Sequence, residues 1–321
     1  MKVRQLLSAL AGLGIAGLAH AQAYPNHPVR VIVPWPPGQA TDLAARIIAD
    51  RLSQALGQPF VIDNKPGAGG KIGTDLVAKA APDGYTLLAA SSGPVSIAPN
   101  LEKLSYAPLT DLAPVSVIAV NPFALVTFPN FPANNAKEFI AKLKAAPDKY
   151  TFASSGTGAT AHLITAYFNS QAGVHARHVP YKGSVPALTD IMGGQVDYTC
   201  ETVPSVVAHV KSGKLKTFGV TFTKRSSAMP DVPTISEVTG IPNFNIGSWI
   251  GYEGPAGLPK DIAEKLSAAV KTAVAASETR DHYLPLGLDQ MSNTPAEMGV
   301  MLRREQDRFA AIVKENHITI Q

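Results

Sequence analysis

The segment VIVPWPPGQATDLAARII, from Val31 to Ile48, decides the fold class because it joins a strand to a helix through one short loop. Its first part belongs to VRVIVP, a β-branched apolar run that predicts a buried strand. Its second part opens TDLAARIIADRLSQAL, which predicts a helix that ends at Gly57. The larger apolar side chains of this helix fall on one face and are Leu43, Ile47, Leu52 and Leu56.

The loop between these two elements, PWPPGQ, contains three prolines and a tryptophan. Proline restricts the loop backbone, whereas Gly38 permits another molecule to approach the backbone closely. Thr41 and Asp42 stand where their side chains can cap the following helix. A loop that only reverses the chain needs far less restriction, so this loop is a candidate for part of a site.

Apolar and amphipathic runs alternate along most of the chain, which predicts βαβ units and mostly parallel sheets covered on both faces. Further strands are expected at FVIDN, YTLLAAS, FALVTF, YTFASS, ARHVPY, VDYTCE and LKTFGVTF. The pattern starts again from Pro122, so two α/β units are expected, and about 300 residues is at the upper limit for one core. Ligands of open α/β sheets bind at the carboxyl ends of the strands, where helix N-termini converge.

The C-terminal part is organised differently. Residues 224–246 are expected to be rich in loops, and SWIGYEGPAG is expected to be extended. Two long helices should follow, the first with Pro259 in its first turn. The second should begin at Thr294, with Glu297 three residues later completing a capping box.

The N-terminus has the pattern of a cleavable secretory signal over residues 1–23. Lys2 and Arg4 precede an apolar run from Leu6 to Leu18, which is too short to span a bilayer, and small residues follow it. The alternative is a buried N-terminal helix. Without the signal, 26 basic residues face 24 acidic ones, and no basic run argues for nucleic acid. The mature protein is therefore expected to be soluble and exported.

Three loops offer small residues, hydroxyl groups and free backbone N–H groups at strand ends or helix starts. They are the proline loop, SSGP from Ser91 to Pro94, and SSGTGATAH from Ser154 to His162. Such loops make an anion site without charged residues, which suits a carboxylate. Because such loops occur in both halves of the chain, the sequence favours a ligand held between two lobes.

The sequence contains few of the motifs that would indicate an enzyme. PGAGGKIGT lacks the spacing of a phosphate-binding loop, and no G-x-S-x-G motif is present in the sequence. Cys200 is the only cysteine, which excludes an intramolecular disulfide and favours a small buried hydrophobe. An exported hydrolase that uses Ser154 or Ser155 needs a base, and His162 has no evident orienting acid. No cofactor and no metal site are expected.

Several motifs together resemble the Bug family, the extracytoplasmic substrate-binding proteins of tripartite tricarboxylate transporters. They are YPNHPVRVIVPWPPGQATD, NKPGAGGKIGTDLVAKAAPDGYTLL, ASSGTGATAHL, HVPYKGSVPALTDIMGGQVD, KRSSAMPDVPTISE and GPAGLP. The resemblance covers nearly all of the mature chain. It implies a type II periplasmic-binding-protein fold, with residues 24–122 and 224–321 in one lobe and 123–223 in the other. It also implies that the proline loop is a preformed wall and carboxylate cradle.

The resemblance carries a set of ligand-site residues onto this sequence. In the first lobe they are Pro36, Pro37, Gly38, Thr41, Asp42, Ser91 and Ser92. In the second lobe they are Ser154, Ser155, Gly156, Thr157, Thr160, Tyr181, Gly183 and Ser184. Asp42 can instead cap its own helix.

This sequence departs from the family pattern at three places. Gln39 stands where a second glycine is common, so a side chain enters the loop, and Ala159 replaces a frequent serine. Glu201 replaces an aspartate that faces the cleft, where it can meet an amino group or another hydrogen-bond donor of the ligand. Trp35, with other aromatic residues, can line the cleft and favour an aromatic acid, or it can simply pack the core.

The sequence therefore predicts a periplasmic receptor that binds a small carboxylate (a di- or tricarboxylate, an amino acid or an aromatic acid) and delivers it to the membrane subunits of a secondary transporter. The alternative is a ligand-sensing receptor coupled to a sensor kinase or another membrane partner. The protein is expected to be a monomer.

Overall fold

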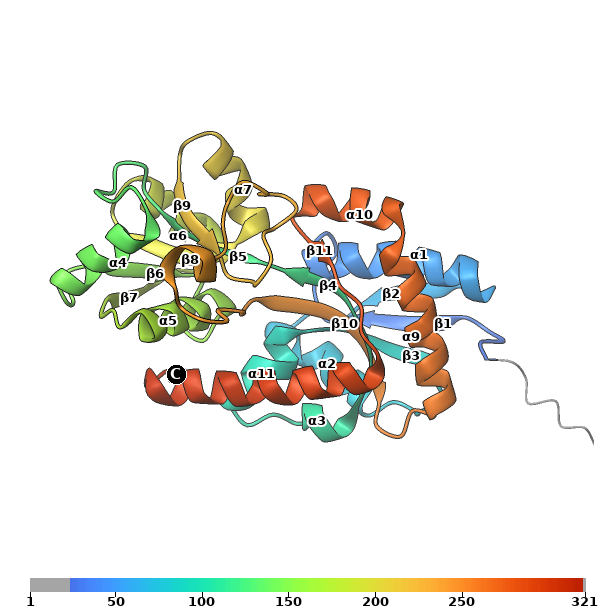
Figure 1. Ribbon diagram of the computed structural model, residues 1–321. Coiled ribbons are helices and arrows are strands. Elements are labelled where there is room, and N and C mark those ends of the chain that lie inside the picture. Colours follow the sequence, from blue (N-terminus) through green and yellow to red (C-terminus); the bar gives the residue numbers. More distant parts are fainter. Residues whose placement is uncertain (1–23, 320–321) are drawn as a thin grey trace, which may run out of the picture.

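The computed structural model describes residues 24–319, which form two mixed β-sheets covered by helices (Figure 1). The predicted signal segment, residues 1–23, lies outside the described residues. Between residues 24 and 319, no helix is long and apolar enough to cross a membrane.

Sheet A has six strands in the order β11-β4-β10-β3-β1-β2. They are β1 (Val29–Val33), β2 (Phe60–Asn64), β3 (Thr86–Ser91), β4 (Leu112–Asn121), β10 (Ser248–Pro255) and β11 (Asp289–Gln290). The expected parallel pairing holds for β1 with β2 and β3, because helices connect these strands. In contrast, β10 pairs antiparallel with β3 and β4, since it returns from the other sheet.

Sheet B has five strands in the order β7-β6-β8-β5-β9. They are β5 (Phe123–Thr127), β6 (Thr151–Ser154), β7 (Arg177–Pro180), β8 (Tyr198–Thr202) and β9 (Lys216–Val220). In this sheet the parallel pairs are those of β6 with β7 and of β6 with β8. β5 follows directly from β4 of the other sheet and pairs antiparallel with β8 and β9. Sheet B is therefore mixed, as sheet A is.

The helices alternate with the strands much as the sequence pattern predicts. They are α1 (Ala40–Leu56), α2 (Lys71–Ala78), α3 (Pro108–Asp111), α4 (Ala136–Ala145), α5 (Thr160–Ala172), α6 (Ser184–Met192), α7 (Val203–Lys211), α8 (Ile235–Thr239), α9 (Lys260–Ala275), α10 (Ser277–Tyr283) and α11 (Pro295–Glu315). Four short helical turns complete the described chain: η1 (Ala68–Gly70), η2 (Gly93–Ile97), η3 (Ala98–Asn100) and η4 (Leu284–Leu286). Pro259 is the N-cap of α9 and so precedes its first turn.

The buried face of α1 differs from the predicted one. Gly57 ends the helix in the left-handed conformation, as expected, and Leu52 is buried. The rest of the buried face is built mainly from small side chains, including Ala45 and Ala49. Leu43, Ile47 and Leu56 are only partly buried. Small residues allow the helix to lie close to sheet A, where Tyr252 of β10 donates a hydrogen bond of 2.9 Å to the Ala45 carbonyl.

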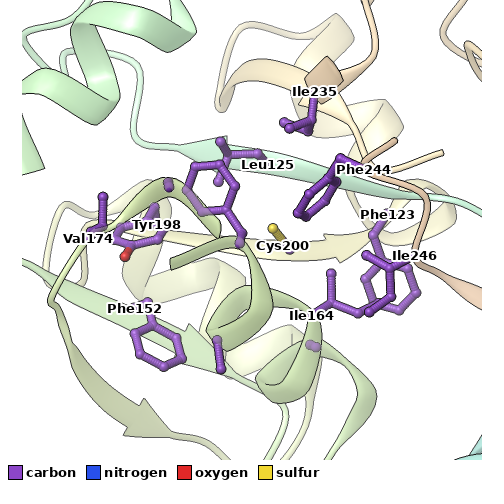
Figure 2. Close-up of a cluster of buried hydrophobic side chains, with 14 of the residues drawn as sticks. Phe123, Leu125, Phe152, Ile164, Val174, Tyr198, Cys200, Ile235, Phe244 and Ile246 are labelled. Carbon is purple, nitrogen blue, oxygen red and sulfur yellow. The ribbon is translucent and has the colours of Figure 1, made fainter. Parts of the chain in front are cut away.

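A large apolar cluster fills the space around sheet B (Figure 2). Phe123, Leu125 and Cys200 from the strands pack there with side chains from α5. Cys200 is a free, buried cysteine, as predicted, and burial raises the pKa of its thiol to about 12. Residues 228–246, which the sequence assigns to the first lobe, contribute Ile235 and Phe244 to this cluster.

Helix α11 packs against the cores of both sheets and runs along one side of the molecule (Figure 1). Met298 and Leu302 near its start belong to an apolar cluster on sheet A. Phe309 and Ile312, farther along, belong to the cluster on sheet B. The predicted capping box is present at its start, with Thr294 as N-cap and Glu297 as its partner.

Candidate functional site

A cavity of about 660 Å³ lies between the two sheets, where strand ends and helix starts meet. This cleft is lined from the sheet A side by the proline loop and residues around α2 and η2, and from the sheet B side by the loop before α5 and the start of α6. Its lining residues are Trp35, Gln39, Ala68, Gly69, Lys71, Gly93, Ile97, Ala98, Leu101, Glu102, Phe123, Ser155, Gly156, Thr157, Gly158, Ala159, Thr160, Ala161, Ser184, Glu201, Thr202 and Ser248. A cavity of this size is typical of a small-molecule site.

Helices that begin at the cleft have no side-chain cap. Gln39 is the N-cap of α1 and Ala159 is the N-cap of α5, and neither side chain accepts a hydrogen bond from its helix. Helices α2 and α6 begin after Gly70 and Gly183, which have no side chain to offer. The first N–H groups of a helix have no partner within it, and together they carry partial positive charge. The cleft therefore presents backbone donors from both of its sides to an anion.

Two stacked histidines hold the loop before α5. Ser154, which is buried, forms a hydrogen bond of 2.6 Å with Nε2 of His178, and Gly158 donates its N–H to Nδ1 of His162 at 3.1 Å. The two imidazole rings lie 3.7 Å apart and nearly parallel. Burial lowers the pKa of each histidine to about 4, and for His162 the neighbouring ring adds to the effect.

This histidine pair also tests the hydrolase alternative. The partner of Ser154 is His178 and not His162, because the Nδ1 atom of His162 already accepts from Gly158. The Ser154 hydroxyl is also bonded to the backbone of Gly156 and does not line the cleft. The interaction therefore shapes the loop and does not expose a nucleophile.

Asp42 holds the proline loop through a different kind of contact. Its carboxylate is buried and accepts from the Gly38 N–H at 2.9 Å, the Asn64 amide at 2.8 Å and Arg46. Burial alone would raise the pKa of Asp42, but the hydrogen bonds from Arg46, Gly38 and Asn64 outweigh it and lower the pKa. Because these donors satisfy the carboxylate, Asp42 holds the proline loop in place, and it does not cap α1, which was the alternative that the sequence offered.

Charged groups in the cleft are few. Lys71 is the only basic residue in the lining that the structure describes, and it pairs with Glu102 at 2.5 Å. Glu201 is almost fully buried, and its burial raises the pKa of its carboxyl group against the opposing effect of hydrogen bonds from Thr202 and Ser184. In the described lining, therefore, no unpaired cation is present to neutralise an anion, and the raised pKa of Glu201 makes its carboxyl group easier to protonate.

Among the predicted ligand-site residues, eight line the cleft: Trp35, Gln39, Ser155, Gly156, Thr157, Thr160, Ser184 and Glu201. The indole of Trp35 is held by a hydrogen bond of 3.0 Å to Ser91, which itself lies behind the wall. The other predicted residues are outside the lining and are Pro36, Pro37, Gly38, Thr41, Asp42, Ser91, Ser92, Ser154, Tyr181 and Gly183.

The residues outside the lining have identifiable surroundings. Pro36, Pro37 and Gly38 are exposed at the tip of the proline loop. Tyr181 donates its hydroxyl to Asp190 at 2.7 Å, so it turns toward α6. Ser92 accepts, at 3.4 Å, from the backbone N–H of Trp249. None of these residues belongs to the lining of the cleft in the described chain.

Ala68, Gly69 and Lys71 line the cleft but are not among the ligand-site residues predicted from the sequence. They lie in the motif PGAGGKIGT. That segment fails as a phosphate-binding loop, but it is still a glycine-rich start of a helix. Gly70 has a left-handed backbone and packs closely against the Trp35 ring, so a larger residue would be strained there. A glycine-rich helix start was the available signal, and it is the same signal that identified the other loops.

Known proteins match this chain over nearly its whole length. The family model described as tripartite tricarboxylate transporter family receptor matches residues 44–318. Protein BugT of Bordetella pertussis is 37% identical over 308 residues, which cover 95% of this chain and 94% of BugT.

Solved structures agree with this match. An R. palustris protein solved with adipate is 32% identical, with a TM-score of 0.75 and coverage of 92% of this chain and 99% of that one. MatC from Rhodopseudomonas palustris, solved with bound malate, is 33% identical, with a TM-score of 0.70 and coverage of 90% and 100%.

Proposed function

The chain belongs to the tripartite tricarboxylate transporter receptor family, and from this premise we propose that its cleft binds a small aliphatic dicarboxylate. Members of this family are periplasmic solute-binding proteins, so the protein is a receptor and not an enzyme. The observation that carries the choice of ligand is the set of uncapped helix starts on both sides of the cleft.

Two groups of donors favour a ligand with an acidic group at each end. On the sheet A side, the starts of α1 and α2 surround Gln39 and Gly69. On the sheet B side, the start of α5 and its preceding loop offer Thr157 and Thr160 with backbone N–H groups. One carboxylate on each side completes both groups of donors, whereas a monocarboxylate leaves one group to water.

The neutral lining also bears on selectivity. A free basic residue would attract any anion, but Lys71 is already paired with Glu102. Selection then depends on how well ligand oxygens fit the fixed N–H and hydroxyl groups, because donors left unpaired in a closed site are costly. Glu201 can donate to a ligand oxygen when it is protonated, which favours a ligand with a hydroxyl or carbonyl group near that position.

Closure of two lobes over the ligand accompanies this proposal. We propose lobes close to those the sequence suggests, with the second lobe extended to residue 246, because residues 228–246 pack with sheet B. Closure removes water from the cleft and strengthens the contacts with backbone donors. We also propose that residues 1–23 direct export to the periplasm and that the closed receptor delivers its ligand to the membrane subunits of a secondary transporter.

A thermal-shift screen of the purified mature chain tests the proposed ligand. The panel holds aliphatic dicarboxylates of increasing length, matched monocarboxylates, tricarboxylates, amino acids and aromatic acids. A ligand at 100 times its dissociation constant adds about 2.7 kcal/mol to the unfolding free energy, which is enough to raise the midpoint by several degrees.

The expected result is a shift with one or more dicarboxylates and a smaller shift with the monocarboxylate of the same length. Equal shifts with the two would contradict the proposal of two anchoring groups. A response to amino acids alone would instead assign Glu201 to the ligand's amino group. The matched variant Glu201→Gln separates these outcomes, because it retains a donor and removes the acid.

A further inference from the structure

A second cavity, of about 530 Å³, lies beside the crossing connections between the two sheets. Its walls come from the end of β4, residues 222–227 after β9, residues 245–249 leading into β10, β11 and the middle of α11. It shares only Ser248 with the cleft, so the two cavities are separate spaces that meet at the start of β10. This hinge cavity falls within the size range of small-molecule sites.

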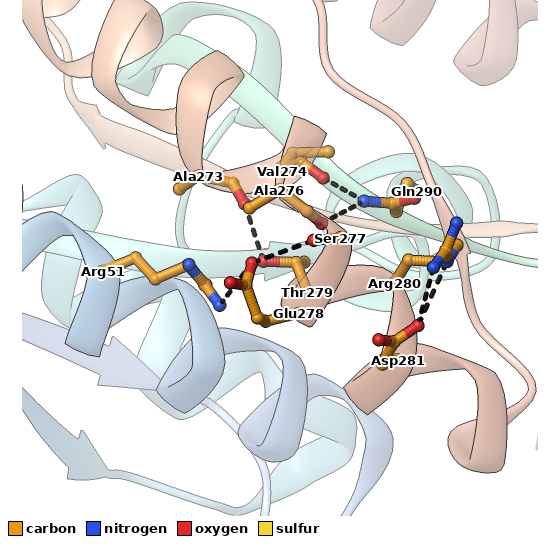
Figure 3. A network of polar contacts seen from close by, with 10 residues as sticks. All are labelled: Arg51, Ala273, Val274, Ala276, Ser277, Glu278, Thr279, Arg280, Asp281 and Gln290. Carbon is orange, nitrogen blue, oxygen red and sulfur yellow. Dashed lines mark hydrogen bonds and ion pairs between the residues drawn. The ribbon is translucent and has the colours of Figure 1, made fainter.

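The part of the wall formed by β11 is held in place by hydrogen bonds to the end of α9. The Gln290 amide donates to the carbonyls of Val274 and Ala276 at the end of α9 (Figure 3). Next to it, Asp289 accepts from the backbone N–H of Ser227 at 3.0 Å. This contact ties the segment after β9 to the strand of the other sheet.

The hinge cavity is rich in basic side chains, unlike the cleft. Lys224, Arg225, Arg304 and Arg308 all line it. Arg225 pairs with Glu237 at 3.3 Å, and Arg308 donates to the carbonyl of Asn245. The side chains of Lys224 and Arg304 make no hydrogen bond or ion pair with residues 24–319.

Two acidic residues of the same cavity do not balance these charges. Asp289 is engaged with Ser227, and Glu305 accepts from the indole N–H of Trp249 at 2.7 Å. Burial raises the pKa of Glu305 to about 7, against the opposing influence of Arg308 and Arg304. Basic groups therefore outnumber ionised carboxylates here at neutral pH, and two of them have free donors.

We propose that the hinge cavity is a second binding site, for a small anion with two or more acidic oxygens. Lys224 and Arg304 supply the uncommitted charge, and Arg308 retains N–H groups that its contact with Asn245 does not use. A concave cavity of this volume suits a free solute better than a flat protein partner. The site differs from the cleft in chemistry, because it attracts its ligand by charge and the cleft does so by neutral donors.

Because the hinge cavity lies between the two sheets, an anion bound there can affect ligand binding in the cleft. The walls of the hinge cavity belong to segments that connect the two sheets, and α11 packs on both. An anion that binds one lobe arrangement more tightly than another changes the affinity of the cleft, and the cleft ligand changes the affinity of the hinge cavity by the same factor.

Isothermal titration calorimetry of inorganic phosphate into the mature chain tests the site, at pH 7.5 in a low-salt buffer without other multivalent anions. The wild type is expected to show saturable binding that weakens as salt is added. The double variant Lys224→Gln/Arg304→Gln is expected to bind phosphate at least about tenfold more weakly. Because both side chains are exposed and neither makes a hydrogen bond or ion pair with the described residues, the variant should keep an unfolding midpoint close to that of the wild type.

The matched control is Arg303→Gln/Lys314→Gln, which removes the same charge from exposed positions of α11 outside the cavity. It should bind phosphate as the wild type does. Equal affinity in wild type and Lys224→Gln/Arg304→Gln would overturn the proposal, since the phosphate would then lie elsewhere, the cleft included. An equal loss in the control, or no saturable binding by the wild type, would overturn it as well.

Discussion

The helix starts at the cleft are built differently from three of those that lie away from it. Away from the cleft, Asn135 caps α4, while Thr234 and Thr294 cap α8 and α11 within capping boxes. At the cleft, α1 and α5 begin at Gln39 and Ala159 without any side-chain cap. These three remote helices satisfy some of their own first N–H groups, whereas the helices at the cleft leave these groups to another molecule. Helices α9 and α10 also lack a side-chain cap, although they lie away from the cleft.

This difference teaches how a cleft with hardly any charge can bind an anion. Under the proposed function, the ligand supplies the oxygen atoms that Ser, Thr or Asn supplies elsewhere, so that binding and helix capping would be the same interaction. The free protein lacks the stability that a side-chain cap would give it, and under the proposed function the complex gains that stability when the ligand binds. The same loops must then be held in place by contacts behind the cleft, and Asp42 and the histidine pair provide them.

The largest effect is expected when a cleft helix is given its own cap. In Ala159→Asp, the new carboxylate should accept from the first turn of α5, because Ala159 already has the extended backbone of an N-cap. The free protein should gain about 1 kcal/mol in unfolding free energy. Ligand affinity should fall by about 100-fold, since the donors are occupied and like charges repel. Calorimetry and thermal unfolding measure the two effects.

A matched control exists at α10, which also begins after an uncapped alanine but lies away from the cleft. Ala276 is its N-cap and has a similar extended backbone. Ala276→Asp should leave ligand affinity unchanged, and its gain in stability should be smaller than that of Ala159→Asp, because Ala276 also ends α9, where a negative charge is unfavourable. If both variants lost affinity alike, the special role of the cleft helix starts would be disproved.

A smaller effect is expected from the contacts behind the cleft. His178→Ala leaves the buried Ser154 hydroxyl without its histidine and removes the stacked ring beside His162. The unfolding free energy should fall by about 1–3 kcal/mol, because one buried hydrogen bond is lost together with the packing of the ring on Phe152 and His162, while Ser154 keeps its contacts with Gly156. Ligand affinity should fall too, because the loop of Gly156 and Thr157 is no longer fixed. His175→Ala, at an exposed histidine nearby, should change neither quantity.

Acid should weaken the two supports of the cleft in different ranges of pH. The folded pKa of His162 and His178 is about 4, below the usual value near 6.5, so the unfolded chain binds protons at higher pH than the folded chain. Their contribution is fully present above about pH 6.5 and is lost as pH falls toward 4. Asp42 has a lowered pKa, so its contribution is lost only as pH falls below its usual range near 4.

Urea unfolding of the free protein at several pH values measures this difference. Between pH 7 and pH 5, the wild type should lose about 1–2 kcal/mol, after allowance for the partial exposure of His178. In His178→Ala the loss should be clearly smaller. An unchanged pH dependence in the variant would mean that other groups cause the acid sensitivity.

Much of the fold could be predicted from periodicity. The βαβ runs placed most strands and helices, and Thr294 with Glu297 identified the start of α11. Strands β4 and β11 are not among the predicted strands, because they are defined by pairing between segments that lie far apart in the sequence. The periodicity also misjudged the buried face of α1, where close packing on the sheet selects alanines over leucines.

The candidate site could be predicted at the level of loops but not of side chains. Glycine, serine and proline mark where the chain turns at the cleft, and the strand order brings those turns together. Whether a residue faces the cavity depends on partners far away in sequence. Asp42 turns to Asn64 and Tyr181 turns to Asp190, and neither pairing follows from the motif that contains them. Resemblance supplied candidate residues, and packing decides which of them form the surface.

The smallest effect is expected at a remote helix start, and it tests the other half of the contrast. Asn135→Ala removes the cap of α4, whose side chain accepts from the Glu138 N–H at 2.9 Å. The unfolding free energy should fall by about 1 kcal/mol. Ligand affinity should stay within twofold, because no residue of α4 lines the cleft in the described chain. Asn135→Ser keeps an acceptor for the Glu138 N–H without placing a second carboxylate beside Glu138, and it should restore stability. A fall in affinity that tracks the loss of stability would show that any weakened helix start loosens the cleft, and the distinction between the two kinds of helix start would then have no bearing on binding.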